Sequence, residues 1–412
     1  MELIWRYLRV QERFRFFVVA VYLVILIVIG LFWPSSVGFF EAYWNILFAS
    51  GVLVTDYFVI GSIGASLVNA GIVGFIGLML ISFTKTTLSG PTIAAVFTMA
   101  GFALFGKTPI NIWPIIVGVA ISAYIRKDQF RTYIVVALFG TALGPVVSQI
   151  AFGLGLGYGL AIIVGVLVGM LLPALASHVL HNHQGFSLYN VGFTCGIVGM
   201  YVTAVLKFRG LLPGLTLQWG QEAQLQLAVI FAAYFFSMVV LGWSGREKAK
   251  ELWKLPGTLV TDFVSEQSFH SALYNMGLVG LMGMLYIGLV RGDFNGPTIG
   301  GVFTIVGFGA FGKHIRNIWP IMLGVFLASH ISIWQPNDPG PLLAALFATT
   351  LAPIAGGFGP AIGILAGVLH LAVVMHVGAF HAGMNLYNNG FAGGLVGTLF
   401  IGLSRWFNNG KR

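Results

Sequence analysis

The sequence predicts an all-α polytopic membrane protein built from two inverted-topology repeats with discontinuous or re-entrant helices. Three observations lead to this prediction: the composition is very apolar, the chain repeats itself half-way along, and short Gly- and Pro-bounded segments occupy matching places in both halves. Hydrophobic residues make up 58% of the 412 residues and charged residues only 8%, against roughly 25% in a typical soluble domain. This composition excludes a soluble enzyme and a disordered chain.

The first predicted helix remains in the membrane. Arginines precede the apolar stretch 16–34, which is long enough for the ~30 Å hydrocarbon core and longer than the ~7–15-residue core of a signal peptide. Basic residues mark the cytoplasmic side of membrane proteins, so we expect the N-terminus in the cytoplasm. The formal charge of +9 is explained in the same way, and no nucleic-acid partner is expected. The predicted location is the inner or plasma membrane, with the lipid bilayer as partner.

The chain is a duplication. GPTIAAVFTMAGF begins at Gly90 and GPTIGGVFTIVGF begins at Gly296, an offset of 296 − 90 = 206 residues. Towards the end of each half, a second shared block begins at His183 and His381, where the offset is 381 − 183 = 198. Identity over whole halves does not arise by chance, so internal repeats define the architecture.

The distribution of Lys and Arg predicts that the two repeats, 1–206 and 207–412, have opposite orientations. The loop 126–131 carries three basic residues, whereas the equivalent loop 334–341 carries none. The linker 244–256 carries four, and its equivalent in the first half carries none. Since basic loops are cytoplasmic, the linker and both termini are predicted in the cytoplasm. Inverted repeats of this kind are found in many transporters.

Two segments of each repeat are too short to span the bilayer comfortably. In the first repeat they are 91–106 and 111–125, each bounded by Pro and Gly. Matched, interrupted segments of this kind point to discontinuous helices around a midplane site. The other predicted segments of the first repeat are 15–34, 41–60, 66–84, 132–150, 157–180 and 186–207.

Two motifs resemble those of the urea transporter family. The stretch Asn295–Gly307 resembles that family's Asn-Pro-x-Ser-Gly signature, and the stretches from Tyr189 and Tyr387 resemble its Gly-Tyr-Asn-x-x-Leu-Val-Gly motif. The resemblance implies paired half-membrane pore helices, a selectivity filter on a pseudo-two-fold axis and a homotrimer. The sequence departs from the family at Gly192 and Gly390, where the family has threonine. The filter residues that the resemblance implies are Pro91, Thr92, Tyr189, Asn190, Pro297, Thr298, Tyr387 and Asn388.

The same fold is implied for a flavin-bearing membrane subunit of sodium-pumping oxidoreductases. Leu88–Thr92 faintly resembles the flavin attachment site of those subunits, but proline replaces alanine and no acid lies just upstream. We therefore expect no cofactor.

Aromatic and hydroxyl side chains repeat inside the central segments. Phe97 and Thr98 of the first repeat match Phe303 and Thr304 of the second. Two phenylalanines flanking a pore could form a flat slot for planar solutes, with the threonine hydroxyls as ligands. The alternative interpretation is ordinary packing or contact with lipid.

The matched acids Asp56 and Asp262 lie inside apolar stretches, where a carboxylate is costly and usually faces a cavity or a partner. They are either proton- or cation-sensitive groups beside a pore, or caps of broken helices whose carboxylates accept backbone N–H bonds. Glu266 and His270 lie four residues apart in the second repeat only. They form either a proton relay or a polar interfacial surface.

Lys107 and Lys313 follow short helices. They either complement the helix C-terminal dipole or form an anion-attracting ring at the two pore mouths. His183 and His381 precede the Tyr-Asn blocks and are candidates for gating or hydrogen bonding. We expect no metal site, since no local Cys, Asp or Glu completes a shell.

The leading functional prediction is a channel or facilitative transporter for a small polar solute, such as a urea-like amide, with its path between the repeats. A neutral, hydrogen-bonding lining favours this class of solute over a bare metal ion. One alternative is a transporter coupled to H⁺ or Na⁺ through Asp56 and Asp262. The other is the flavin-bearing subunit. No sequence motif indicates an enzyme.

Overall fold

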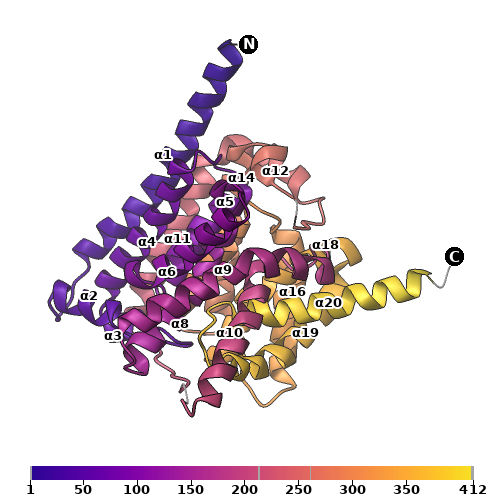
Figure 1. The fold of residues 1–412 in the computed structure, drawn as a ribbon. Helices are drawn as coiled ribbons and strands as arrows, with labels where there is room; N and C mark the ends of the chain where they lie inside the picture. The colour runs from indigo at the N-terminus through magenta and orange to yellow at the C-terminus, as the bar shows by residue number, and fades with distance from the viewer. Residues whose placement is uncertain (1, 212–213, 260, 410–412) are drawn as a thin grey trace.

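The structure, a computed structural model, describes residues 2–211, 214–259 and 261–409 and is helical (Figure 1). Nine helical stretches among these residues are long and apolar enough to cross a membrane. They are Val10–Phe32, Ile63–Phe83, Phe130–Gly153, Tyr158–His183, Asn190–Phe208, Gln224–Leu241, Phe269–Leu289, Pro339–Phe358 and Pro360–Phe380. The prediction of an all-α polytopic membrane protein is therefore confirmed.

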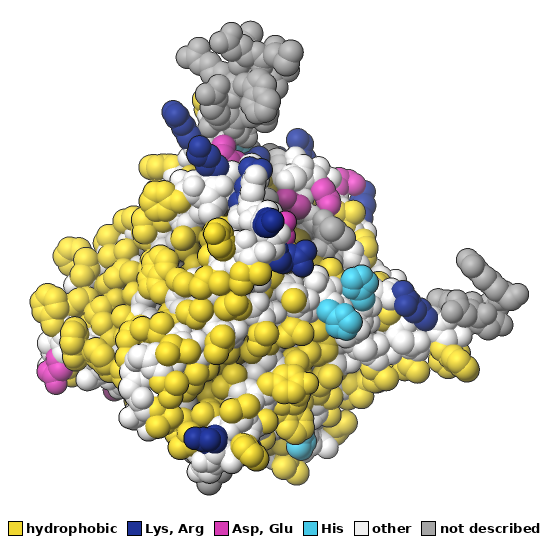
Figure 2. Space-filling model, viewed as in Figure 1, with side chains coloured by type: hydrophobic (Ala, Val, Ile, Leu, Met, Phe, Trp, Pro, Cys, Tyr) yellow, Lys and Arg dark blue, Asp and Glu magenta, His cyan; other side chains and the backbone are white. Residues whose placement is uncertain are grey.

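The surface is suited to lipid. In Figure 2, hydrophobic side chains cover most of the visible face, whereas Lys, Arg, Asp and Glu gather mainly at its upper end, near the N-terminal helix. Phe17, Ile163 and Phe236 are each more than half exposed, at 67%, 59% and 56%. Large apolar patches are unfavourable in water and are expected where helices face hydrocarbon.

The order of long and short helices is the same in both halves, with ten α-helices in the described part of each. The first half contains α1 (Glu2–Phe32), α2 (Phe39–Leu47), α3 (Tyr57–Ile60), α4 (Ile63–Phe83), α5 (Gly90–Phe102), α6 (Pro109–Ile125), α7 (Ile134–Gly140), α8 (Gly144–Ser148), α9 (Tyr158–His183) and α10 (Asn190–Phe208). The second contains α11 (Gln224–Leu241), α12 (Arg246–Leu252), α13 (Phe263–Glu266), α14 (Phe269–Leu289), α15 (Gly296–Phe308), α16 (Ile315–His330), α17 (Pro339–Phe347), α18 (Ala352–Phe358), α19 (Pro360–Val377) and α20 (Asn388–Asn409).

The predicted segment 41–60 is not one helix. Helix α2 ends at Leu47 and α3 begins at Tyr57, with extended backbone around Val54 that hydrogen-bonds to the residues 216–218. Gly51 has a φ of +63°, a left-handed conformation through which a right-handed helix cannot continue. The break places Asp56 at the start of α3.

The predicted helix 132–150 is also interrupted. Helix α7 ends at Gly140, and a tight turn over Thr141–Leu143 leads into α8. Pro145 in the first turn of α8 has no N–H, so the hydrogen-bond ladder of α7 stops there. The equivalent break separates α17 from α18, where Pro353 occupies the same position. Both halves therefore carry a bent, nearly fully buried span.

Contacts between the two halves are reciprocal, so that a bond from one half to the other has its equivalent in the reverse direction. Two pairs of backbone bonds have this property: Leu53 N to Gly383 O (3.0 Å) with Leu259 N to Gly185 O (3.1 Å), and Leu188 N to Thr350 O (2.9 Å) with Leu386 N to Ala142 O (3.1 Å). Reciprocal contacts are a property of a two-fold relation. They are the pattern expected of two equivalent halves related by a two-fold axis.

Helices α5 and α15 form the centre of the core and lie antiparallel. A Cβ atom added at Gly101 would lie 2.7 Å from the carbonyl oxygen of Gly300, and one added at Gly307 would lie 2.9 Å from that of Ala94. Glycine is required there because the backbones touch. Each helix has 13 residues, or about 20 Å at 1.5 Å per residue, so neither spans the ~30 Å core.

Candidate functional site

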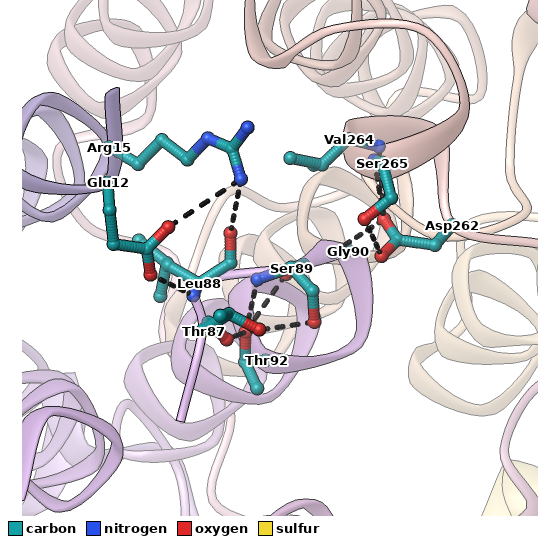
Figure 3. Close-up of polar contacts among 10 residues, drawn as sticks. All are labelled: Glu12, Arg15, Thr87, Leu88, Ser89, Gly90, Thr92, Asp262, Val264 and Ser265. Carbon is teal, nitrogen blue, oxygen red and sulfur yellow. Dashed lines mark hydrogen bonds and ion pairs between the residues drawn. The ribbon is translucent and has the colours of Figure 1, made fainter. Parts of the chain in front are cut away.

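Two carboxylates join the halves at the N-termini of the central helices. The Asp56 carboxylate accepts N–H bonds from Gly296 (3.2 Å) and Gly220 (2.9 Å). The Asp262 carboxylate accepts the equivalent bond from Gly90 (2.8 Å; Figure 3). Each acid also accepts an N–H from the short helix that follows it, α3 or α13. Each acid therefore caps a helix of its own half and the central helix of the other half, at the end where negative charge is stabilised.

The predicted filter threonines close the first turns of α5 and α15. Thr92 Oγ1 accepts the N–H of Ser89 (2.8 Å), and Thr298 Oγ1 accepts that of Asn295 (2.9 Å). Both threonine side chains are buried. The Thr92 hydroxyl also donates to the Ser89 carbonyl (3.0 Å; Figure 3). Residues Pro91 and Pro297 occupy the same first turns, where a missing N–H costs nothing.

Helix α1 holds the segment that leads into α5. Leu88 N donates to Glu12 Oε1 (2.6 Å), and Arg15 Nη1 donates to the Leu88 carbonyl (3.4 Å) while lying 3.7 Å from the Glu12 carboxylate (Figure 3). Glu266 and His270, the pair predicted in the second repeat, make different contacts. Glu266 accepts the N–H of Asp262 (3.3 Å), and the His270 ring stacks on Phe14 at 5.7 Å.

A polar cavity lies beside each of these helix N-termini. The cavity next to Gly220 and Asn295 has a volume of about 560 Å³, and the one next to Arg15 and His270 has about 480 Å³. Equivalent residues line the two cavities: Phe58 and Val264, Val59 and Ser265, Gly61 and Gln267, Ser62 and Ser268, and Ile63 and Phe269. The two cavities are therefore equivalent, one in each half.

The Tyr-Asn blocks meet at the seam between the halves. The rings of Tyr189 and Tyr387 lie 5.1 Å apart, measured between centroids. Tyr387 packs on Phe102 at 4.6 Å and Tyr189 on Phe308 at 4.8 Å, an equivalent pair of contacts. All four rings are buried. We call these residues, together with Phe139 and Phe347 packed against them, the central aromatic cluster.

Two inner cavities end at this cluster. One has a volume of about 170 Å³ and is lined by Pro91 and Leu259; the other has about 270 Å³ and is lined by Leu53. Equivalent residues line both: Val135 and Leu343, Phe139 and Phe347, Leu188 and Leu386, Asn190 and Asn388, and Phe311 and Phe105. Pro91 is at the start of α5 and Leu53 lies near Asp56, at the start of α15. Because α5 and α15 are antiparallel, the cavities approach the cluster from opposite ends.

The phenylalanines predicted to flank a slot lie elsewhere on the seam. The rings of Phe97 and Phe303 stack on each other at 6.2 Å, and Phe303 also packs on Phe235 at 5.5 Å. Neither ring is among the described residues that line the two inner cavities. Thr304 Oγ1 donates to the Gly300 carbonyl (3.0 Å), whereas the buried Thr98 hydroxyl has no hydrogen-bond partner among the described residues.

The structure places both lysines in the interior, which differs from the predicted ring at the pore mouths. Lys107 and Lys313 are fully buried because α5 and α15 end inside the protein. Lys313 Nζ donates to Tyr189 Oη and to Thr349 Oγ1 (2.7 Å). Lys107 Nζ lies 5.2 Å from the centre of the Phe102 ring and has no hydrogen-bond partner among the described residues. The lysines thus contact the central aromatic cluster.

The histidines hold the Tyr-Asn blocks in place. His183 Nε2 lies 2.9 Å from Asn190 Oδ1, and His381 Nε2 lies 3.0 Å from Asn388 Oδ1. Each asparagine amide also donates to a carbonyl of the preceding long helix, α9 or α19. Both asparagines line an inner cavity as well. Among the described residues, no group of three His, Cys, Asp or Glu side chains could hold a metal ion.

One protein family matches the chain in two stretches, residues 35–208 and 244–406, one in each half. The chain belongs to the family described as "Protein of unknown function (DUF1576)". The two stretches contain α2 to α10 and most of α12 to α20 and leave out α1 and α11. No curated protein and no solved structure matches the chain. The matches thus contain Asp56 and Asp262, the lysines and the Tyr-Asn blocks of the site.

The sequence prediction missed the residues that close the cluster from the bent spans. Phe139 packs on Tyr387 and Phe347 packs on Phe102, and Thr349 accepts a hydrogen bond from Lys313. A signal for them exists: Leu138-Phe139-Gly140-Thr141 matches Leu346-Phe347-Ala348-Thr349 at an offset of 347 − 139 = 208. This offset is two residues longer than the 206 of the blocks at Gly90 and Gly296, so a comparison at the fixed offset of 206 does not align the two stretches.

Proposed function

We propose that the protein is a channel or facilitative transporter for a small polar solute, with its path along the seam between the halves. One observation carries this proposal: two equivalent inner cavities approach the same aromatic cluster from opposite ends of the antiparallel central helices. The duplication accounts for the matching of the two cavities, and the proposal rests on their ending at the same cluster on the seam. Sites at repeat interfaces, formed by broken helices, are typical of transporters.

In this proposal the barrier is the central aromatic cluster, which contains the contact between Tyr189 and Tyr387, with ring centroids 5.1 Å apart, and contributes residues to the lining of both inner cavities. Opening requires these rings, or the bent spans behind them, to move. Motions that open and close such barriers are the usual basis of gating and alternating access.

The test is solute flux into proteoliposomes, followed by stopped-flow light scattering with a panel of small solutes. Val136→Trp and Leu343→Trp each place a large ring in one inner cavity, and we expect both to reduce flux. Val117→Trp is the matched control, because Val117 is 43% exposed on α6 and lies outside the residues that line the cavities. If Val136→Trp and Leu343→Trp both pass solute as fast as the wild type, the path lies elsewhere. If the wild type passes solute no faster than empty vesicles do, uncoupled permeation is rejected.

The coupled alternative makes a different prediction in the same vesicles. If Asp56 or Asp262 couples transport to H⁺ or Na⁺, an uncoupler or removal of Na⁺ abolishes accumulation of the solute. The contacts of both carboxylates with backbone N–H groups favour a structural role. We therefore expect flux to follow the solute gradient alone.

A further inference from the structure

The two inner cavities occupy equivalent places but differ in polarity. The 270 Å³ cavity has two asparagines and two histidines in its lining: Asn388, Asn389, His376 and His381. In the 170 Å³ cavity, Asn190 is the equivalent of Asn388, but Val191 stands at the position of Asn389. Among the described residues, neither lining contains Lys, Arg, Asp or Glu. The polarity of the larger cavity therefore comes from amide and imidazole groups.

Asn389 is held by a histidine that the first half lacks. His370 lies fully buried on α19, and its Nε2 lies 2.9 Å from Asn389 Oδ1. Because an amide oxygen only accepts hydrogen bonds, the ring nitrogen donates. The equivalent residues of the first half are Leu172 and Val191, at the offset 370 − 172 = 198 of the Tyr-Asn blocks. A histidine inside an apolar span that faces the protein interior commonly marks a functional site.

The amide of Asn389 has a free donor. Its oxygen faces His370, and within the described residues its Nδ2 donates to no group, although the side chain lines the cavity. Asn388 differs, because its Oδ1 pairs with His381 and its Nδ2 donates to the Val374 carbonyl (3.2 Å). A link between helices explains the bond from His370 to Asn389, but it leaves the free amide N–H₂ group unexplained.

The two histidines in the lining offer acceptors. His376 Nδ1 donates to the Ala372 carbonyl (2.8 Å), which leaves Nε2 of the neutral ring as an acceptor. His381 Nε2 donates to Asn388, and its buried Nδ1 has no partner among the described residues. The cavity thus combines one amide donor and imidazole acceptors with apolar walls, the usual composition of a site for a small molecule.

Resting on the proposed transport function, we propose that the solute is recognised in the 270 Å³ cavity and is a small uncharged molecule with a carbonyl oxygen, such as a carboxamide. Asn389 Nδ2 donates to that oxygen and determines specificity. His370 is a positioning residue, because its bond to Oδ1 turns the N–H₂ group of the amide towards the cavity. The 170 Å³ cavity, with Val191 at this position, is a passage without this recognition.

The first experiment measures acetamide flux into proteoliposomes as a function of acetamide concentration. Asn389→Val should raise the half-saturating concentration about two- to tenfold, the change expected for loss of one neutral hydrogen bond, with little change in maximal flux. His370→Leu should act in the same direction, and His370→Gln, which keeps an N–H donor, should restore part of the loss. His330→Leu is the matched control, because His330 is exposed at the end of α16 and lines neither inner cavity.

A paired variant separates recognition from structure. His370→Leu combined with Asn389→Val reproduces Leu172 and Val191, which occupy these positions in the first half. The paired variant should therefore keep the wild-type unfolding temperature even if His370→Leu alone does not fold. A raised half-saturating concentration in the folded paired variant supports the inference. A wild-type value there overturns it, because the pair then only joins α19 to α20, and the proposed transport function still stands.

The second experiment measures binding without transport, by saturation-transfer NMR from the purified protein in detergent to acetamide. Transfer should be strong in the wild type and in His330→Leu and weak in the paired variant. Equal transfer in the wild type and the paired variant overturns the site, whether or not the vesicles transport any solute. Transfer that depends on the pair, in a protein that shows no flux, supports the site and rejects transport.

Discussion

Although Asp56 and Asp262 are equivalent in the repeat, replacing each with asparagine should have different effects on stability. Both oxygens of Asp56 accept backbone N–H bonds, and its Oδ2 accepts from Gly220 at 2.9 Å. Asparagine places an N–H₂ group where one oxygen was, so a donor then faces the Gly220 N–H. At Asp262, the second oxygen accepts from the Ser265 hydroxyl at 2.7 Å. That hydroxyl can reverse and accept from an asparagine amide.

The structure also gives the expected sizes. Asp56 is fully buried, so Asp56→Asn should cost about 1–3 kcal/mol, the range for leaving a buried donor unsatisfied. Asp56→Ala loses the helix cap as well, worth about 1 kcal/mol, for a total of about 2–4 kcal/mol. Asp262 is only half-buried, and water can reach the groups it leaves. Asp262→Asn should therefore stay within about 0.5 kcal/mol of the wild type, the usual range for a tolerated substitution.

The assay is thermal unfolding of the purified variants in one detergent, with size-exclusion chromatography to confirm that each remains monodisperse. We expect the wild type and Asp262→Asn to unfold together, Asp56→Asn to unfold at a lower temperature and Asp56→Ala at the lowest. Equal losses for Asp56→Asn and Asp262→Asn would refute the reasoning from acceptor geometry and show that the negative charge itself is needed. Loss of solute flux in a fully stable Asp262→Asn would instead support the coupled transporter.

Three further predictions test the packing of the seam. Gly192→Leu should destabilise the protein by about 1–3 kcal/mol through overpacking, because a Cβ added at Gly192 would lie 2.8 Å from Tyr387 Cβ. A Cβ added at Gly402 on α20 meets nothing within 4 Å, so Gly402→Leu should be tolerated in the same thermal assay. Thr349→Val should lower the unfolding temperature more than Thr141→Val, since only the former removes an acceptor of the Lys313 ammonium group; equal effects would mean that both lysines bind their threonines. Cys195, which is fully buried, should react with a membrane-permeant maleimide only after unfolding, as followed by mass spectrometry.

Much of the fold could be predicted, because the apolar composition indicates the membrane-spanning helices and the internal repeat indicates which segments are equivalent. The short central helices were predicted at 91–106 and observed at 90–102, bounded by Pro91 and by the glycines that follow. A broken helix at Asp56 was predicted only as one of two alternatives, with no position for the break at Gly51, and the break at Pro145 was not predicted. Each lies inside an apolar stretch, where a bent buried span and a straight helix have the same composition. Local hydrophobicity reports burial in the membrane, and it does not report where a ladder of hydrogen bonds stops.

The candidate site was predicted less completely, because it depends on contacts between the halves. The sequence predicts that Asp56 and Asp262 are either caps or pore groups, but it cannot show that each caps the central helix of the opposite half. The Tyr-Asn blocks were placed at the seam by resemblance, and Tyr189 and Tyr387 do meet there. The positions of Lys107 and Lys313 differ from the predicted pore mouths, since the depth at which a short helix ends is set by tertiary packing.

The placement of charge along the central helices explains why a lysine follows each helix, but it does not explain why both lysines are buried. Each helix begins at a carboxylate, Asp262 for α5 and Asp56 for α15. Each is followed by a lysine whose backbone N–H closes the last turn, so both ends complement the helix dipole. A dipole interaction requires only that the positive charge be near the helix end, and it is satisfied equally by a lysine that reaches water. It therefore does not account for the full burial of both lysine side chains, which depends on the depth at which α5 and α15 end inside the protein.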